Sequence, residues 1–123
     1  MTITSELLQL LMEIGYLAGG YGLLNDSETI FEAIKSVRPE SEYPLIGLAV
    51  TKMNANNNED AIAILKNQAL KVNPQSDLAR SFLGLALKHA GYGSESQSVL
   101  QEVLNSGKDA VAVKMAQAIL DGN

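Results

Sequence analysis

A repeated spacing of about 34 residues is the feature that most constrains how this chain of 123 residues can fold. Three columns of similar residues recur 34 and then 35 positions apart along the chain. They are Ile14-Gly15, Leu48-Ala49 and Leu83-Gly84; Ser27, Ala61 and Ser96; and Phe31, Leu65 and Leu100. Because all three columns gain one residue at the same step, the slip indicates a single insertion after Leu65. A period of this length predicts a stack of repeated helical units that share one core.

Each unit divides into two helical segments joined by a turn. In the first unit, apolar residues between Leu7 and Ala18 recur at helical spacing, and the glycine-rich stretch 19–22 interrupts them. The second segments of the first two units end before Pro39 and Pro74, since proline disfavours helix in the residue before it. We place the units at about residues 8–41, 42–76 and 77–110, followed by a capping helix at about 109–121. Residues 1–123 then form a single all-α domain.

These positions resemble those of tetratricopeptide repeats, whose helix-turn-helix unit places small residues where its two helices cross. The short side chains of Gly15, Ala49 and Gly84 would face Ser27, Ala61 and Ser96, which lets the paired helices approach closely. The resemblance implies three such repeats and a C-terminal capping helix in a right-handed superhelical stack with a concave groove. A bundle of six or seven helices with coinciding periods is the alternative.

Composition excludes several classes of function. The chain has 9 Lys and Arg against 14 Asp and Glu, a net charge of −5, so it lacks the basic surface of a protein that binds nucleic acid or an anionic membrane. It has no cysteine, which excludes disulfides, thiolate zinc sites and cysteine nucleophiles. Its apolar runs are too short to span a bilayer, and its first residues lack the basic start of a secretory signal. We therefore expect a cytoplasmic protein with neither nucleic acid nor membrane as a partner.

No constellation of residues indicates catalysis, and we expect no enzymatic activity, cofactor or metal. The stretch Gly19-Gly20-Tyr21-Gly22 lies where the repeat needs a turn and lacks the Lys and Ser or Thr of a phosphate-binding loop. The single histidine, His89, lies near the end of a predicted helix, which favours an interaction with the helix dipole over metal binding.

The first helix of each unit is expected to line the concave face. Most residues at its ligand-facing positions are apolar, and an exposed apolar strip usually marks a partner site in a soluble protein. The candidate partner-binding groove consists of Met12, Tyr16, Tyr43, Ile46, Val50, Met53, Leu78, Ser81, Leu85 and His89. An amphipathic helix fits such a strip. The alternatives are that a second copy of the chain covers these residues or that they belong to ordinary core.

Four segments also resemble the repeat proteins of type III secretion systems, above all the chaperones of the needle subunit. They are Ile14-Gly-Tyr-Leu-Ala, Ile30-Phe-Glu-Ala-Ile, Val37-Arg-Pro-Glu-Ser and Pro44-Leu-Ile-Gly-Leu-Ala. This resemblance implies that the groove holds the amphipathic C-terminal helix of a self-assembling needle subunit before export, together with a small helical co-chaperone. The second hypothesis is a structural repeat adaptor for protein–protein assembly, with a homo-oligomer when no ligand is bound.

Overall fold

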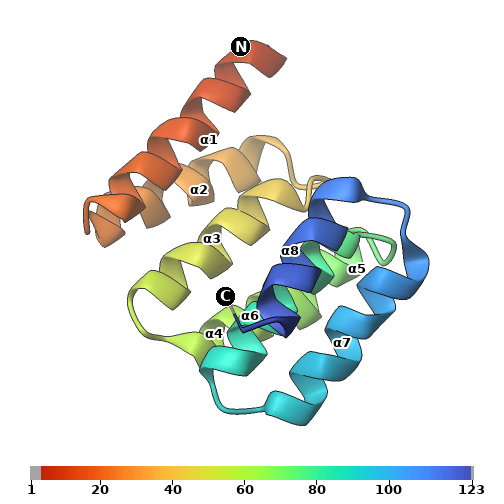
Figure 1. Cartoon of the computed structure of the whole chain (residues 1–123). Coiled ribbons are helices and arrows are strands. Elements are labelled where there is room, and N and C mark those ends of the chain that lie inside the picture. The colour runs from red at the N-terminus through yellow and green to blue at the C-terminus, as the bar shows by residue number, and fades with distance from the viewer. Residues whose placement is uncertain (1–3, 123) are drawn as a thin grey trace.

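Helices alone build the part of the chain that the structure, a computed structural model, describes, residues 4–122. The first unit consists of α1 (Ser5–Gly20) and α2 (Leu24–Val37). The second begins with α3 (Tyr43–Asn54) and returns through α4 (Asn58–Ile64), η1 (Leu65–Ala69) and α5 (Leu70–Val72), which follow one another without a break. The third is formed by α6 (Asp77–His89) and α7 (Gly93–Ser106), and α8 (Ala110–Leu120) follows it. Figure 1 shows these units stacked side by side, which confirms the predicted all-α repeat fold.

Local sequence signals fix where the helices begin and end. The side-chain oxygens of Thr4, Ser76 and Asp109 accept hydrogen bonds from backbone N–H groups in the first turns of α1, α6 and α8, as N-caps do. Pro44 lies in the first turn of α3, where its missing N–H is not needed. Gly107 adopts a left-handed conformation, with φ at 65°, and ends α7. These caps set the lengths of the helices that the stack brings together.

The small residues expected at the helix crossings make the same contact in two units. In the first unit, the Ser27 hydroxyl donates a hydrogen bond of 2.8 Å to the Gly15 carbonyl. In the third unit, the Ser96 hydroxyl donates one of 2.7 Å to the Gly84 carbonyl. A Cβ atom on Gly84 would lie 2.4 Å from the Leu100 side chain, so the close approach of α6 and α7 requires glycine there. The sequence period therefore corresponds to a repeated packing contact.

A π-helical turn in the second unit accounts for the one-residue slip in the repeat spacing. The turn, η1, begins at Leu65, the last residue before the inferred insertion. A π turn absorbs one extra residue within a helix, so the buried face continues on both sides of it. Equivalent buried residues are three positions apart in α2 and α7 but four apart in η1: Phe31 and Ile34, Leu100 and Val103, and Leu65 and Ala69.

A second hydrophobic cluster joins the last unit to α8. The main cluster runs through the first two units and α6, and the second lies between α7 and α8. The helix α8 also lies across α6 (Figure 1), where the Ser81 hydroxyl donates a hydrogen bond of 3.1 Å to the Ala112 carbonyl. The fully buried or nearly buried members of the second cluster are Leu100, Val103, Ala112, Ala116 and Ile119. The helix α8 thus covers the C-terminal end of the stack.

Candidate functional site: the concave groove

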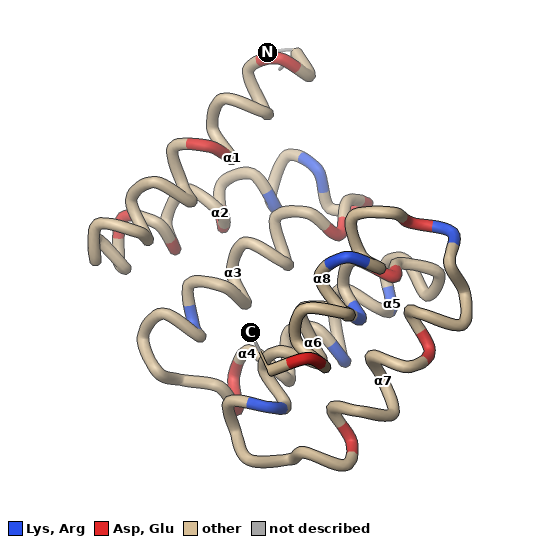
Figure 2. The backbone as a smooth tube through the Cα atoms, viewed as in Figure 1, with Lys and Arg blue, Asp and Glu red and all other residues tan. Residues whose placement is uncertain are grey.

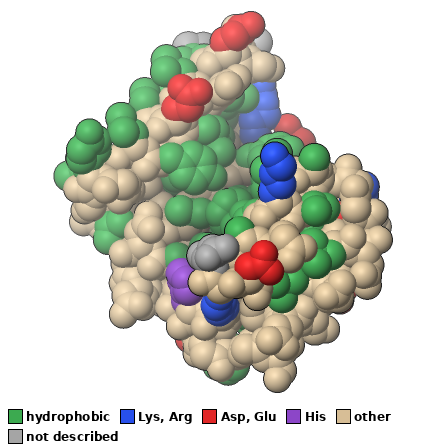
Figure 3. Space-filling model, viewed as in Figure 1, with side chains coloured by type: hydrophobic (Ala, Val, Ile, Leu, Met, Phe, Trp, Pro, Cys, Tyr) green, Lys and Arg blue, Asp and Glu red, His purple; other side chains and the backbone are tan. Residues whose placement is uncertain are grey.

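A hollow on the concave face lies between α1, the loop from α2 to α3, and the start of α3. It has a volume of about 740 Å³. Its apolar lining consists of Leu8, Met12, Tyr16, Ile34, Tyr43 and Pro44, and its polar lining of Ser5, Gln9, Arg38, Glu40 and Ser41. Figure 3 shows that hydrophobic side chains gather on this face between α1 and α8. A hollow of this size and composition suits the apolar side chains of a bound segment.

Three of the predicted groove residues line this hollow, and they come from two different units. Met12 and Tyr16 occupy successive turns of α1, and Tyr43 begins α3. Tyr16 has 38% of its surface exposed and Tyr43 has 54%. Outside the hollow, the half-buried members of the predicted set are Val50, Met53, Leu78 and Leu85, and the exposed member is His89. The structure therefore brings together the first unit and the start of the second.

The prediction that Ile46 and Ser81 line the groove surface is corrected here, because the structure places both side chains inside the protein. Ile46 is 1% exposed and Ser81 is 0% exposed. The hydrogen bond from Ser81 to α8 shows what covers it, and Leu85 packs against the cluster that α8 forms with α7. Part of the groove surface predicted on the third unit is thus occupied by this chain's own α8.

The ring of Tyr16 is held by packing at the edge of the core. It meets the ring of Phe31 edge to face, with centroids 4.9 Å apart and planes at 67°. Burial raises the pKa of Tyr16 from 10.0 to about 12, because the phenolate would lose hydration that the neutral phenol does not need. The side chain therefore presents a positioned aromatic surface and a neutral hydroxyl to the hollow at neutral pH.

Among the described residues, the charged groups that border the concave face do not form a cluster of free cations. Arg38 and Glu40 lie together at the rim of the hollow. Further along, the Lys88 ammonium donates a hydrogen bond of 2.9 Å to the Ile119 carbonyl at the end of α8. Figure 2 shows both basic and acidic residues distributed over the molecule, with only acidic residues on α1 and α7. A groove that grips a carboxylate group needs several unengaged donors, so this arrangement favours an apolar ligand.

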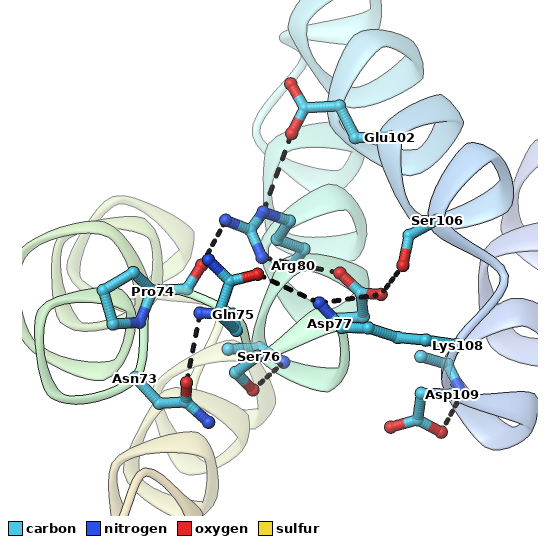
Figure 4. Close-up of polar contacts among 12 residues, drawn as sticks. Asn73, Pro74, Gln75, Ser76, Asp77, Arg80, Glu102, Ser106, Lys108 and Asp109 are labelled. Carbon is cyan, nitrogen blue, oxygen red and sulfur yellow. Dashed lines mark hydrogen bonds and ion pairs between the residues drawn. The ribbon is translucent and has the colours of Figure 1, made fainter.

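A polar cluster at the start of α6 holds the loop that leads into α8 (Figure 4). Asp77 is 5% exposed, and its carboxylate accepts a hydrogen bond of 2.5 Å from the Ser106 hydroxyl. The same carboxylate lies 3.4 Å from the Arg80 guanidinium and 3.8 Å from the Lys108 ammonium. Because three donors from α6, α7 and the following loop converge on one buried carboxylate, they fix the direction in which the chain enters α8.

Within residues 4–122, the side chains offer little for metal chemistry. No group of three or more His, Cys, Asp or Glu side chains in that range could hold a metal ion. His89 is exposed in the last turn of α6. None of the helices in the same range is long and apolar enough to cross a membrane.

The part of the hollow contributed by the α2–α3 loop was missed by sequence reasoning. Arg38, Glu40 and Ser41 line it from this loop. A repeat template assigns ligand-facing positions only within first helices, so it gives no signal for loop residues. A signal for Leu8 was present, since Leu8 lies one turn before Met12 on the same side of α1.

The fold has several counterparts among solved structures. No protein-family model and no curated protein matches the sequence. The Yersinia enterocolitica type III secretion translocator chaperone SycD aligns with a TM-score of 0.78 and 16% identity, over 98% of this chain and 92% of SycD. A SycD complex with a peptide of the translocator YopD aligns with a TM-score of 0.71 and 16% identity, over 100% of both chains. The first tetratricopeptide-repeat domain of Spaghetti (RPAP3), bound to the HSP90 peptide SRMEEVD, aligns with a TM-score of 0.74 and 18% identity, over 96% of this chain and 99% of that domain.

These likenesses identify the fold. The chain has the tetratricopeptide-repeat fold, as the sequence period predicted. Its structural neighbours include a secretion chaperone and a peptide-binding repeat domain, and two of these neighbours were solved with a peptide bound. At such low identities, the likeness establishes the fold.

Proposed function

We propose that this protein is a cytoplasmic chaperone that binds an amphipathic helix of a self-assembling secretion subunit in its concave groove. The observation that carries the proposal is the hollow of about 740 Å³ that Met12, Tyr16 and Tyr43 line from two units. These side chains leave apolar surface exposed on a face that the repeat fold curves inward. A helix with apolar residues three and four positions apart would fill the hollow and continue over Val50.

The likeness to SycD supports a role in secretion, because SycD is a translocator chaperone and one of its structures contains a translocator peptide. The sequence resemblance supports a narrower client, the C-terminal helix of a needle subunit. We propose that client, with a small helical co-chaperone as a further partner. The function needs no catalytic residue, since shielding an aggregation-prone helix is achieved by covering it.

Burial of the client's apolar face would provide the binding free energy. Covering roughly 500 Å² of apolar surface would contribute about 12 kcal/mol before the entropic costs of association are subtracted. Those costs leave an affinity in the micromolar to nanomolar range. The client would thus stay monomeric in the cell and could still be released.

The test is co-elution of the purified protein with a purified needle subunit in size-exclusion chromatography. Tyr43→Ser and Val50→Asp should abolish co-elution, because the first removes exposed apolar surface from the groove and the second places a charge at a half-buried predicted groove position. Tyr92→Ser is the matched control, since Tyr92 is also about half exposed but lies at the start of α7. Helical circular dichroism should persist in all three variants. Retained binding in both groove variants would exclude the groove as the site.

A structural adaptor is the second candidate, and the exposed apolar residues of the groove favour it as well. A homo-oligomer formed through the groove would bury Tyr43 against a second copy. Light scattering across a range of protein concentrations separates the two functions. A dimer that Tyr43→Ser dissociates would favour the adaptor, and a monomer that binds the needle subunit would favour the chaperone.

A further inference from the structure

The outer face of α1 carries a continuous stripe of exposed apolar side chains that the groove does not use. Leu10 is 51% exposed, Ile14 42% and Leu17 60%. Leu7 and Tyr21 extend the stripe at 43% and 77% exposure. The five positions follow one another at intervals of three and four residues, the spacing of a seam between two packed helices. The residues of α1 that line the hollow, Met12 and Tyr16, lie outside this stripe.

The stripe occupies the positions that are buried in the first helices of the later units. One repeat further on, the equivalents of Leu10, Ile14 and Leu17 are Pro44, Leu48 and Thr51, each at most 3% exposed. In the third unit they are Ala79, Leu83 and Ala86, with exposures of 0%, 3% and 0%. The hydrogen bond of 2.9 Å between the Thr51 and Ser27 hydroxyls shows that α3 turns this face towards the preceding unit. On α1, no preceding unit is present within the described residues.

The two ends of the stack therefore differ. At the C-terminal end, α8 packs on α6 and α7 and covers the core. At the N-terminal end, the equivalent surface is open, and Figure 3 shows hydrophobic side chains along α1. The exposed side chains are also larger than most of their buried equivalents, because Leu10 and Leu17 stand where the third unit has alanine. Large side chains hold a packed helix at a distance that allows interdigitation, as in a coiled coil, instead of the close crossing within a repeat.

The charges along the stripe indicate that its partner is a different protein and not a second copy of this chain. The helix α1 contains Glu6 and Glu13 and no Lys or Arg, and both glutamates precede a stripe residue, so they lie along the same edge. Among the described residues, neither glutamate takes part in an ion pair. Two copies paired through this stripe would bring only acidic side chains to the edges of the seam, and like charges there oppose association. Basic residues on a partner would instead meet Glu6 and Glu13.

We infer that the outer face of α1 is a docking surface for a helix of another protein, distinct from the groove ligand. That helix carries apolar residues at intervals of three and four, with Lys or Arg along one flank. It covers the open N-terminal end of the stack as a preceding repeat would. The inference stands independently of the proposed function, since it uses none of the residues of the hollow.

The test uses synthetic helical peptides of about three heptads with leucine at the seam positions. One peptide carries lysine at the flanking positions, a second carries glutamate there, and a third has the lysine peptide's composition in scrambled order. Fluorescence anisotropy measures their binding to the full chain at low salt. We expect the lysine peptide to bind at least about tenfold more tightly than the other two. Equal binding of the lysine and scrambled peptides would overturn the inference.

Substitutions in the stripe and in the groove test where the lysine peptide binds. The double variant Leu10→Ser/Leu17→Ser should weaken the lysine peptide about tenfold or more, whereas the groove variant Tyr43→Ser should bind it normally. Glu13→Lys provides a second, independent variant, and it should reverse the preference between the lysine and glutamate peptides. Unchanged binding in both stripe variants would overturn the inference. A stable dimer in sedimentation velocity that Leu10→Ser/Leu17→Ser dissociates would also overturn it in favour of a second copy. Loss of needle-subunit binding in Tyr43→Ser would concern the groove alone and would not change the conclusion about the stripe.

Discussion

Close contact between small residues fixes the geometry of each helix pair. In the third unit, Gly84 faces Leu100 and accepts a hydrogen bond from Ser96 through its carbonyl. In the first unit, Gly15 faces Phe31 and accepts from Ser27 in the same way. These contacts could be predicted from the sequence, because a crossing of two helices requires small residues at fixed positions in the period. The exposed fraction of each groove residue could not be predicted, since it depends on what the neighbouring helices cover.

Replacing Gly84 by alanine should destabilise the protein by about 1–3 kcal/mol. The new Cβ would lie 2.4 Å from the side chain of Leu100, which is itself 1% exposed and has little room to move. This strain outweighs the gain in helix propensity of up to about 1 kcal/mol. The free energy of unfolding in urea provides the measurement. Gly20→Ala is the control, because a Cβ there meets nothing within 4 Å and the change should be neutral or stabilising.

The raised pKa of Tyr16 should make the folded state lose stability in alkaline solution. Between the ordinary pKa of 10.0 and the folded value of about 12, the unfolded chain loses the Tyr16 proton while the folded chain keeps it. The unfolded state then binds fewer protons, so stability falls as pH rises through this window and is unaffected below it. The effect is smaller than for a fully buried group, because Tyr16 is 38% exposed.

Urea unfolding across that pH window, compared between the natural protein and Tyr16→Phe, measures this dependence. The natural protein should lose more free energy of unfolding than the variant, and Tyr21→Phe should behave like the natural protein, since Tyr21 is 77% exposed. Identical pH profiles for the natural protein and Tyr16→Phe would show that the phenol is not desolvated in the folded state.

Among the elements, η1 shows how far sequence reasoning can reach. The common slip in three columns located an insertion after Leu65, and the structure places the π-helical turn at Leu65–Ala69. The kind of distortion could not be predicted, because an extra residue can also be absorbed in a loop. For the helix α8, the sequence predicted the element but not all of its contacts. Its existence and capping role followed from the apolar pattern, but its burial of Ser81 depends on the direction set by the loop at Asp77.

Deleting Asn67 should convert the π turn into a regular helical turn with little loss of stability. The deletion leaves Leu65 and Ala69 three positions apart, as their equivalents are in α2 and α7, and Asn67 itself is exposed. We expect a change of less than about 1 kcal/mol in the free energy of unfolding in urea. The control is deletion of Gln101, also exposed, which would place Val103 out of register with Leu100 and abolish cooperative unfolding. If deletion of Asn67 also abolished cooperative unfolding, the assignment of η1 as an absorbed insertion would be wrong.

At the scale of the whole molecule, the stack is closed at one end and open at the other. A repeat array is stabilised by contacts between neighbouring units. The element at each end of the stack therefore contributes to the stability in proportion to the surface that it buries. The helix α8 covers Leu100, Val103 and Ser81, whereas no described element covers Leu10, Ile14 and Leu17 on α1. The sequence predicted the C-terminal cap, but the period alone could not show that no described element covers the outer face of the first helix.

Ending the chain at Asp109 should therefore destabilise the remaining units by roughly 2–4 kcal/mol, because it removes the buried Ala112, Ala116 and Ile119 and exposes their partners on α6 and α7. At the opposite end, Leu10→Ser/Leu17→Ser should change stability by less than about 0.5 kcal/mol, since these side chains are already about half exposed. Thermal and urea unfolding of the two variants measure the difference. If the stripe variant lost as much stability as the truncated chain, the outer face of α1 would belong to the fold itself, and its role as a docking surface would have to be abandoned.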